Sequence, residues 1–304
     1  MDGSTNLLPV AATDLSHHPH DHVPAQPESA DHMGVLISFW YYGRFDVSRI
    51  PTSVRVIADS GAFSAWTSGS TVSVPGYAAW LDLISDRVDF AFNLDVIGDE
   101  EGSYRQWVQL QREFGHTTVP VIHYGDRPEA VIPRYLEGGA TRFAISGGAM
   151  RTVPVRQRLA WQALVHKWFR DHAPTVPLHG LGVHMRSPLA RLPWDTIDAS
   201  SFSMTWRMGR LALWSPRRGW RQVELNGRDI YKHGPEVRSY GFEPEEVAVS
   251  TSTTRPKLVR LATRIETRAA AHFNATRSPD RPLRTYLADS TSKDMMIEAE
   301  ELAR

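Results

Sequence analysis

The sequence contains no cysteine among its 304 residues. That absence excludes disulfide bonds, thiolate ligands for zinc and a cysteine nucleophile, and it is typical of a protein that works in a reducing cytosol. Long apolar runs are missing too, because no stretch reaches the roughly 18 residues of a membrane-spanning helix. The N-terminus also lacks the basic and then apolar order of a signal peptide. We therefore expect a cytoplasmic protein with no membrane segment.

An excess of charge of either sign is also missing, since 34 Lys and Arg residues balance 34 Asp and Glu residues. The distribution along the chain is nevertheless uneven. Residues 205–239 carry eight Lys or Arg against three Asp or Glu, and residues 255–285 carry eight against two. Such clustering predicts a basic surface on an otherwise acidic body. Contact with nucleic acid would explain it, and so would a solvated helix face.

The chain divides into three parts by composition. Residues 1–31 are rich in Pro, Ser, Asp and His without any periodicity, which predicts a disordered leader. Its run HHPHDH (17–22) has the residue types of a weak metal site, but a tail without fixed ligand geometry explains it better. Residues 32–273 have the patterns of a folded domain, and residues 274–304 are predicted to be a polar tail that ends in a helix.

Short apolar runs in the first two-thirds of the chain predict strands that alternate with helices. The seven predicted strands are 35–42, 54–59, 88–95, 118–125, 142–148, 176–183 and 196–204. Apolar residues recur at helical spacing in 76–87, 103–115, 127–139 and 155–172. Such alternation is typical of a parallel sheet with both faces covered. The number of strands favours a closed (β/α)8 TIM-type barrel, with an eighth strand in 211–249.

A basic insertion is expected late in the barrel, at about residues 205–240. Its turn pairs, Arg218-Gly219 and Asn226-Gly227, predict a hairpin-like structure. After the insertion, residues 255–273 have the pattern of a basic amphipathic helix.

Polar side chains and glycines stand where most of the predicted strands end. They are Asp59, Asp95, His123, Gly147 with Gly148, His179 with Gly180, and Asp198. In a barrel of parallel strands all carboxyl ends meet at one rim, where barrel enzymes keep their catalytic groups. One strand-end aspartate commonly does no more than bond the next turn. Three of them around one rim predict an active site.

The residue types at this rim leave two chemistries open. Three carboxylates without a thiolate or an HExxH pair could hold a divalent metal, chiefly Mg²⁺, in a metal-dependent barrel hydrolase. They could also act without metal at a sugar carbon, where one carboxylate attacks and another transfers a proton. The glycine-rich turns favour a flat ligand, because glycine lets backbone groups approach it closely. A barrel that only binds nucleic acid is a further alternative.

The order of six motifs resembles that of the tRNA-guanine transglycosylase superfamily. The motifs are ADSGAFS, FNLDV, IHYGD, ISGGAM, LHGLGV and IDASSFSM, and together they span about residues 56–210. Members of that family are (β/α)8 barrels that exchange guanine for a 7-deazaguanine through a covalent ribosyl–enzyme intermediate. The resemblance therefore implies a pentosyltransferase.

The resemblance also assigns roles to the strand-end residues. Asp198 would be the nucleophile on the sugar C1′, and Asp59 would be the general acid and base. Asp95 would read the edge of the base. The other positions that would contact the base are His123, Gly147, Gly148, His179 and Gly180. For these roles Asp198 must be ionised, and the pKa of Asp59 should lie nearer neutrality than usual.

The chain departs from the family at the zinc site, which uses three Cys and one His and cannot exist in a cysteine-free chain. We therefore expect no cofactor, and tRNA becomes the less favoured substrate. The compact chain is more similar to a second branch, the DNA 7-deazaguanine transglycosylases of phages and bacterial genomic islands. DNA and a preQ0-like 7-deazaguanine are then the expected partners, with tRNA as the alternative. Whether the protein forms a homodimer is a question that the sequence leaves open.

Basic residues late in the chain would bind the phosphates of DNA. They are Arg207, Arg210, Arg217, Arg218, Arg221, Lys257 and Arg260. Binding through such contacts falls steeply with salt concentration. Because C1′ is hidden inside a duplex, the target nucleotide must be flipped out or lie in a single strand.

Overall fold

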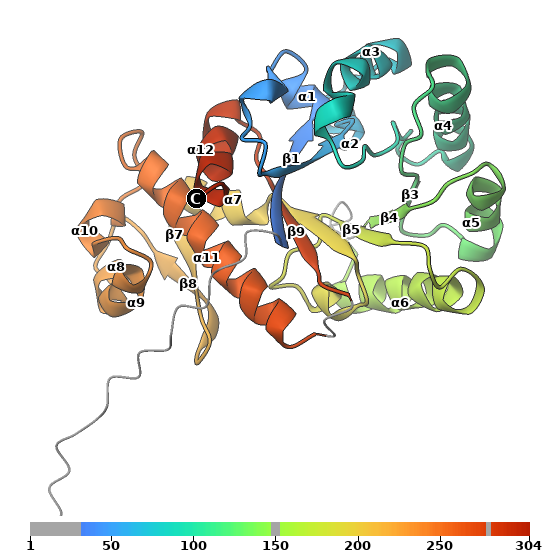
Figure 1. The fold of residues 1–304 in the computed structure, drawn as a ribbon. Coiled ribbons are helices and arrows are strands. Elements are labelled where there is room, and N and C mark those ends of the chain that lie inside the picture. The colour runs from blue at the N-terminus through green and yellow to red at the C-terminus, as the bar shows by residue number, and fades with distance from the viewer. Residues whose placement is uncertain (1–31, 147–152, 278–280) are drawn as a thin grey trace, which may run out of the picture.

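Runs of branched and aromatic residues form the central strands of the protein. The computed structural model describes residues 32–146, 153–277 and 281–304. One curled parallel sheet contains seven strands in the order β2-β1-β9-β6-β5-β4-β3 (Figure 1). Their bounds are β1 (Met33–Ser38), β2 (Arg55–Asp59), β3 (Val121–Ile122), β4 (Phe143–Ser146), β5 (Leu178–Leu181), β6 (Thr196–Ala199) and β9 (Arg284–Ala288). The predicted α/β class and parallel sheet are confirmed.

Residues 89–93 contact both edges of this sheet, because β2 and β3 are its outermost strands. The N–H of Phe92 donates to the C=O of Ala58 in β2 at 2.8 Å. The N–H of Asn93 donates to the C=O of Val119, two residues before β3, also at 2.8 Å. Both contacts have the geometry of parallel strands.

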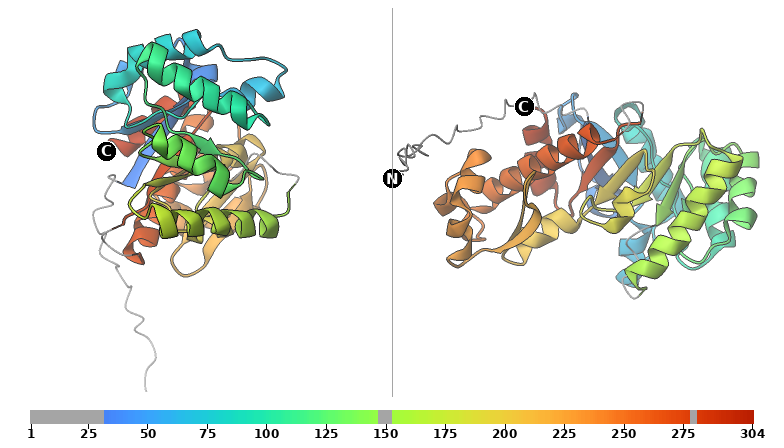
Figure 2. Two further views of the ribbon diagram at one scale, coloured as in Figure 1. Left: turned by 90° about the vertical axis from the view of Figure 1, so that its right-hand side faces the viewer. Right: turned by 90° about the horizontal axis from the view of Figure 1, so that it is seen from below.

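Helices cover the outer face of the sheet (Figures 1 and 2). Those that precede the hairpin are α1 (Phe39–Tyr42), α2 (Ala62–Thr67), α3 (Val74–Ile84), α4 (Glu100–Phe114), α5 (Pro128–Glu137), α6 (Val155–His172) and α7 (Ser201–Arg207), with short 3-10 turns η2 (Val47–Arg49), η3 (Ser85–Arg87) and η4 (Pro188–Arg191). The four predicted helices are thus found as α3 to α6. In α4 the Asp99 side chain accepts from the N–H of Gly102 at 2.9 Å, and Gly115 ends the helix with a φ of 76°. Within the described residues, no helix is both long and apolar enough to cross a membrane.

Two apolar clusters occupy the two sides of the sheet. The larger one lies between the sheet and the helices and includes the buried rings of Trp107 and Phe143. The smaller one collects side chains from inside the curl of the sheet. Its buried members are Leu36, Ile57, Phe92, Val119, Val121, Ala144, Tyr286 and Ala288. They come from β1, β2, residues 89–93, the β3 region, β4 and β9, so most strands of the curl share this inner cluster.

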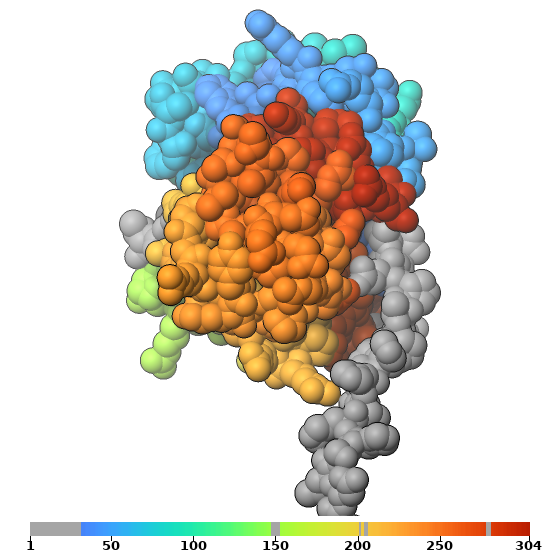
Figure 3. Space-filling model, turned by 90° about the vertical axis from the view of Figure 1, so that its left-hand side faces the viewer, coloured from blue at the N-terminus to red at the C-terminus, as the bar shows by residue number. Residues whose placement is uncertain are grey.

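A separate lobe follows α7 and stands to one side of the sheet (Figures 1 and 3). It contains β7 (Arg210–Ser215) and β8 (Gly219–Glu224), which pair antiparallel in a sheet of their own. Three short helices follow, α8 (Asp229–Lys232), α9 (Gly234–Ser239) and α10 (Pro244–Val247). The predicted hairpin is confirmed. The prediction of an eighth parallel strand in 211–249 is wrong, because the strands found there pair only with each other.

The C-terminal part of the chain completes the main sheet. The predicted amphipathic helix is found as α11 (Arg255–Ala275). β9 then lies between β1 and β6 and pairs in parallel with both, before α12 (Ser292–Leu302) ends the chain. The prediction of a polar tail is therefore wrong for β9. Its five residues, RTYLA, begin with an arginine and are followed by an aspartate, so the apolar run is too short to be noticed, yet four of the five are buried.

Candidate active site

Polar side chains stand beyond the inner apolar cluster at the carboxyl ends of the strands. Side chains alternate along a strand, so residues two positions apart face the same side of the sheet. Ile57 and Val121 belong to the inner cluster, and Asp59 and His123 follow them at that spacing. Ser38, at the end of β1, is paired in register with Asp59. The strand ends therefore direct polar groups toward one region, as the sequence predicts.

Asp198, in β6, is hydrogen-bonded to groups of the neighbouring β5 and the turn after it. His179 Nε2 lies 2.9 Å from Asp198 Oδ1, and the N–H of Gly182 donates to the same oxygen at 2.9 Å. The other ring nitrogen of His179 lies 2.8 Å from Thr196 Oγ1. Burial lowers the pKa of His179, although Asp198 opposes the shift, so the imidazole is neutral. Because a carboxylate only accepts, we assign the single ring proton to Nε2, which donates it to Asp198.

Asp59, at the end of β2, has a raised pKa. Burial raises the pKa of Asp59 to about 6 against the opposing effect of the Gly61 N–H, which donates to its Oδ2 at 2.9 Å. The negative charges of Asp198 and Asp95 add to the rise. Asp198 and Asp95 thus lie close enough to Asp59 for their charges to act on it. A carboxyl group with this pKa can give up and take back a proton near neutral pH.

Gly61 explains the Ser-Gly-Ala turn that follows β2. Its φ of 75° lies in the left-handed region that favours glycine. A Cβ at this position would lie 2.4 Å from the Cβ of Trp40 and 2.7 Å from Ser38 Oγ. Only glycine therefore lets this turn fold back so that its N–H reaches Asp59. The same turn packs the start of α2 against α1.

Asp95 follows residues 89–93 and is held by two side chains. Asn93 Nδ2 donates to its Oδ1 at 3.1 Å, and His123 Nε2 lies 3.1 Å from its Oδ2. Burial lowers the pKa of His123, but the hydrogen bond and charge of Asp95 outweigh burial and raise it. Sequence reasoning missed Asn93, although it stands in the FNLDV motif, because an amide side chain carries no signature of catalysis. Asp95 and His123 together offer an acceptor and a donor at one place.

Of the other predicted base contacts, two cannot be placed and one faces away from this group. Gly147 and Gly148 lie outside the described residues. Gly180 alternates with His179 in β5 and so faces the other side of the sheet. A Cβ on Gly180 would lie 3.0 Å from Val183 and 3.1 Å from Trp194. Close packing therefore explains the glycine at this position.

Most of the basic residues predicted to bind phosphate are paired with carboxylates. The ion pairs are Arg207 with Asp289, Arg210 with Glu224 (2.9 Å), Arg221 with Glu236, Lys257 with Glu246 (2.7 Å) and Arg260 with Glu301 (3.2 Å). Arg217 and Arg218 are exposed between β7 and β8, at the tip of the hairpin. The positive charge of this part of the sequence is therefore largely balanced within the chain itself.

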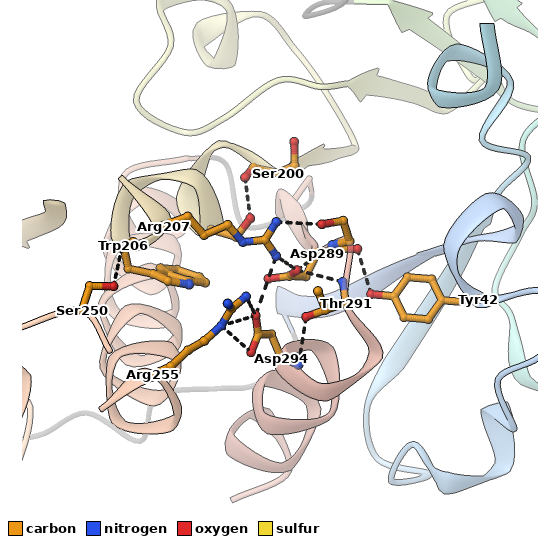
Figure 4. Close-up of polar contacts among 11 residues, drawn as sticks. Tyr42, Ser200, Trp206, Arg207, Ser250, Arg255, Asp289, Thr291 and Asp294 are labelled. Carbon is orange, nitrogen blue, oxygen red and sulfur yellow. Dashed lines mark hydrogen bonds and ion pairs between the residues drawn. The ribbon is translucent and has the colours of Figure 1, made fainter. Parts of the chain in front are cut away.

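Arg207 anchors the helix that follows the Asp198 strand. It is the last residue of α7, and it pairs with Asp289 directly after β9. The side chain of Asp289 has no exposed surface. Asp294 of α12 lies beside this pair and is bonded to Arg255 at the start of α11 (Figure 4). These four residues join three helices and a strand end, which is a structural role that the sequence analysis did not foresee.

The site aspartates are bonded to protein donors. Within the described ranges, no three His, Asp or Glu side chains are grouped so that they could hold a metal ion. In the part of the chain that the structure describes, Asp198 and Asp95 each accept from two groups, and Asp59 accepts from the backbone N–H of Gly61. The arrangement is suited to proton transfer and nucleophilic attack by carboxylates.

Comparison with known proteins adds no relative, because no family model matches the chain and no curated protein is similar to it in sequence. The fold and site define a class: a mixed α/β protein with three interacting aspartates at the carboxyl ends of a parallel sheet.

Proposed function

We propose that the protein is a base-exchange transglycosylase that replaces guanine in DNA with a 7-deazaguanine. Exchange at a sugar carbon needs one carboxylate to attack C1′ and another acid to protonate the leaving base. The proposal rests on the contrast between Asp198, held by two donors, and Asp59, whose pKa burial raises to about 6. Two carboxyl groups in one site with such different surroundings are suited to different roles.

The proposal includes a closed (β/α)8 barrel as the scaffold of this site. Residues 89–93 would be its eighth strand, between β2 and β3. Two observations support this closure. Residues 89–93 bond backbone groups of Ala58 on one side and Val119 on the other, both in parallel, and the inner apolar cluster takes residues from β2, from 89–93 and from the β3 region, where the barrel would close. Filled interiors of this kind are typical of eight-stranded barrels.

In the first half of the exchange, Asp198 would form a bond to the sugar. Among the described residues both donors to Asp198 bond Oδ1, which leaves Oδ2 to attack C1′. The bond between C1′ and guanine N9 breaks, and its electron pair goes to the base. Asp59 gives its proton to that base, so guanine leaves neutral. The products are an aspartyl–sugar ester and the carboxylate of Asp59.

In the second half, the incoming 7-deazaguanine would give its N9 proton to the Asp59 carboxylate. Its N9 attacks C1′, and the bond between C1′ and Asp198 Oδ2 breaks with its electron pair returning to the oxygen. Both aspartates are then in their starting states. The cycle balances protons and electrons within the two aspartates and the two bases.

Asp95 and His123 are suited to recognise the edge of either base. A guanine-like edge presents a ring N–H and an exocyclic amine as donors and a carbonyl oxygen as an acceptor. The Asp95 carboxylate accepts such donors, and the partly exposed His123 ring can donate to the carbonyl. Recognition of features that guanine and 7-deazaguanine share would let one pocket serve both halves of the exchange.

DNA is proposed as the polymer because the chain lacks any cysteine. The tRNA enzymes of the family that the motifs resemble hold zinc with three Cys and one His, and this chain has no cysteine to offer. tRNA is the alternative polymer, since the chemistry at C1′ would be the same.

The experiment that tests the proposal is trapping of the covalent intermediate. The protein is incubated with guanine-containing DNA, or separately with tRNA, together with a 7-deazaguanine base, and the mixture is run on a denaturing gel. We expect a protein–DNA adduct with the wild type and none with Asp198→Ala. Asp198→Asn, which keeps the shape of the side chain, should also form no adduct.

The other outcomes of this experiment are equally informative. An adduct with tRNA alone would transfer the same mechanism to tRNA. No adduct and no base exchange with either polymer would contradict the transglycosylase assignment. Activity abolished by EDTA would favour a metal-dependent hydrolase.

A further inference from the structure

Four large aromatic side chains are exposed close to Asp59 in the sequence. They are Trp40 (37% exposed), Tyr41 (48%), Phe63 (41%) and Trp66 (57%). In the part of the chain that the structure describes, Tyr231 is the one other large aromatic residue exposed to this degree. Rings of this size are usually buried, so a group of exposed ones marks a surface that binds something.

These four residues, the rim aromatics, come from two adjacent strand ends. Trp40 and Tyr41 belong to α1, which directly follows β1. Phe63 and Trp66 belong to α2, which begins three residues after Asp59. β1 and β2 are neighbours in the sheet, and α1 and α2 lie together beside their carboxyl ends (Figure 1). The rim aromatics are therefore continuous with the proposed catalytic site.

Contacts between the two helices hold the rim aromatics in place. The hydroxyl of Tyr41 donates to Ser64 Oγ at 3.3 Å, and the ring centroids of Phe63 and Trp66 are 5.9 Å apart. Trp40 packs over Gly61, where no side chain could fit. The exposed faces of the rings are thus oriented before any ligand binds, which lowers the entropic cost of binding.

A hollow with a positive charge adjoins the rings. It has a volume of about 410 Å³ and is lined by Phe39, Trp40, Tyr41, Gly43 and Arg44. Arg44 is exposed, and none of the described carboxylates forms an ion pair with it. The hollow thus combines flat apolar walls with a cation, whereas most of the basic residues predicted to bind phosphate are already paired.

A strand of unpaired nucleotides fits this combination. Attack on C1′ requires that the target nucleotide leave the stack, so its neighbours lose a stacking partner. Exposed aromatic rings stack on any base, and an arginine beside them can contact the phosphate that joins two nucleotides. A purely apolar partner would leave Arg44 without a counterpart.

We infer that Trp40, Tyr41 and Trp66 form a stacking platform for the unpaired nucleotides that flank the target nucleotide, with Arg44 at their phosphate. The identity of that strand as the substrate rests on the proposed function. The platform itself is a binding site whose occupancy can be measured without catalysis.

The test measures binding of a fluorescent single-stranded oligodeoxynucleotide by anisotropy at low salt, with the fully paired duplex as a second probe. Trp66→Leu keeps apolar surface but removes the large ring, so the affinity for the single strand should fall about fivefold to a hundredfold, the range typical of one stacked base. Trp66→Phe should recover most of the affinity. Tyr231→Leu, an exposed aromatic residue of the lobe, is the matched control and should bind as the wild type does.

Arg44→Gln should weaken binding and reduce its dependence on salt. Circular dichroism of each variant checks that the fold is kept. Equal binding of the single strand by Trp66→Leu, Trp40→Leu and the wild type overturns the platform, whatever the trapping experiment gives. Lost binding by these variants in a protein that forms no adduct supports the platform and contradicts only the transglycosylase.

Discussion

At the scale of single residues, Asp59 and Asp198 have the same side chain and opposite surroundings. Asp198 receives two hydrogen bonds on one oxygen, from a neutral imidazole and from a backbone N–H. Asp59 accepts from the N–H of Gly61, and burial with two nearby negative charges raises its pKa. In the proposed exchange, these differences would separate the nucleophile from the proton donor.

The pKa of Asp59 leads to a prediction about pH. Formation of the adduct needs the protonated acid, so its rate should be highest below pH 6 and fall about tenfold per unit above that value. Single-turnover trapping between pH 5 and pH 9 measures this dependence. Asp59→Asn should be slow throughout and show no break. A wild-type rate that stays level from pH 6 to pH 9 would exclude Asp59 as the proton donor.

Asp59, Asp95, His123 and Asp198 could be found from the sequence because each stands at the end of an apolar run. Side-chain alternation then decides which of them face the same side of the sheet. Asn93 could not be found in this way, since its role depends on a hydrogen bond to Asp95 that the sequence does not reveal.

At the scale of the elements, segments that are far apart in the sequence supply the carboxylates that pair with the basic residues. Arg207 and Asp289 are 82 positions apart, and the aspartate stands in a segment whose strand is too short to recognise. Charge counts along the sequence show where arginines cluster but not which carboxylates meet them. The predicted phosphate-binding surface and the observed ion pairs therefore differ.

Removal of the Arg207 charge should destabilise the protein. Arg207→Met would leave the carboxylate of Asp289 buried and without its partner, which typically costs about 3–5 kcal/mol. Urea denaturation followed by tryptophan fluorescence measures the free energy of unfolding. Arg218→Met, at the exposed tip of the hairpin, is the matched control and should change that free energy by less than about 0.5 kcal/mol.

The result for Arg207 also separates its two interpretations. A residue that served only to bind phosphate would lose affinity for DNA on substitution and keep its stability. An unchanged free energy of unfolding in Arg207→Met would thus show that the ion pair with Asp289 does not hold α7 in place.

At the scale of the whole molecule, the sheet is built from both ends of the chain. β1 is the first strand and β9 is the last, and they pair in register from Met33 with Thr285 to Leu36 with Ala288. The alternation of strands and helices in the sequence predicted the class of fold correctly. It could not predict that the segment between β1 and β6 comes from the C-terminus, because strand order depends on contacts across the whole chain.

Truncation tests the importance of this last strand. A chain that ends at residue 277 lacks β9 and α12, so β1 and β6 lose the strand between them. We expect it to be insoluble, or to lack near-ultraviolet circular dichroism and cooperative thermal unfolding. The control is a chain that begins at residue 32, since residues 1–31 are predicted from the sequence to be a disordered leader. A soluble and cooperatively folded product ending at 277 would show that β9 is dispensable.

The late position of β9 in the sequence also affects folding of the chain during its synthesis. Ribosomes add about 5–20 residues per second, so β9 is synthesised about 10–50 seconds after β1. During that interval the backbone groups on one side of β1 and of β6 have no partner. Unpaired strand edges readily pair with other chains. A nascent chain of this protein is therefore most prone to aggregate before β9 is synthesised, and a chaperone that covers those two edges would act in that interval.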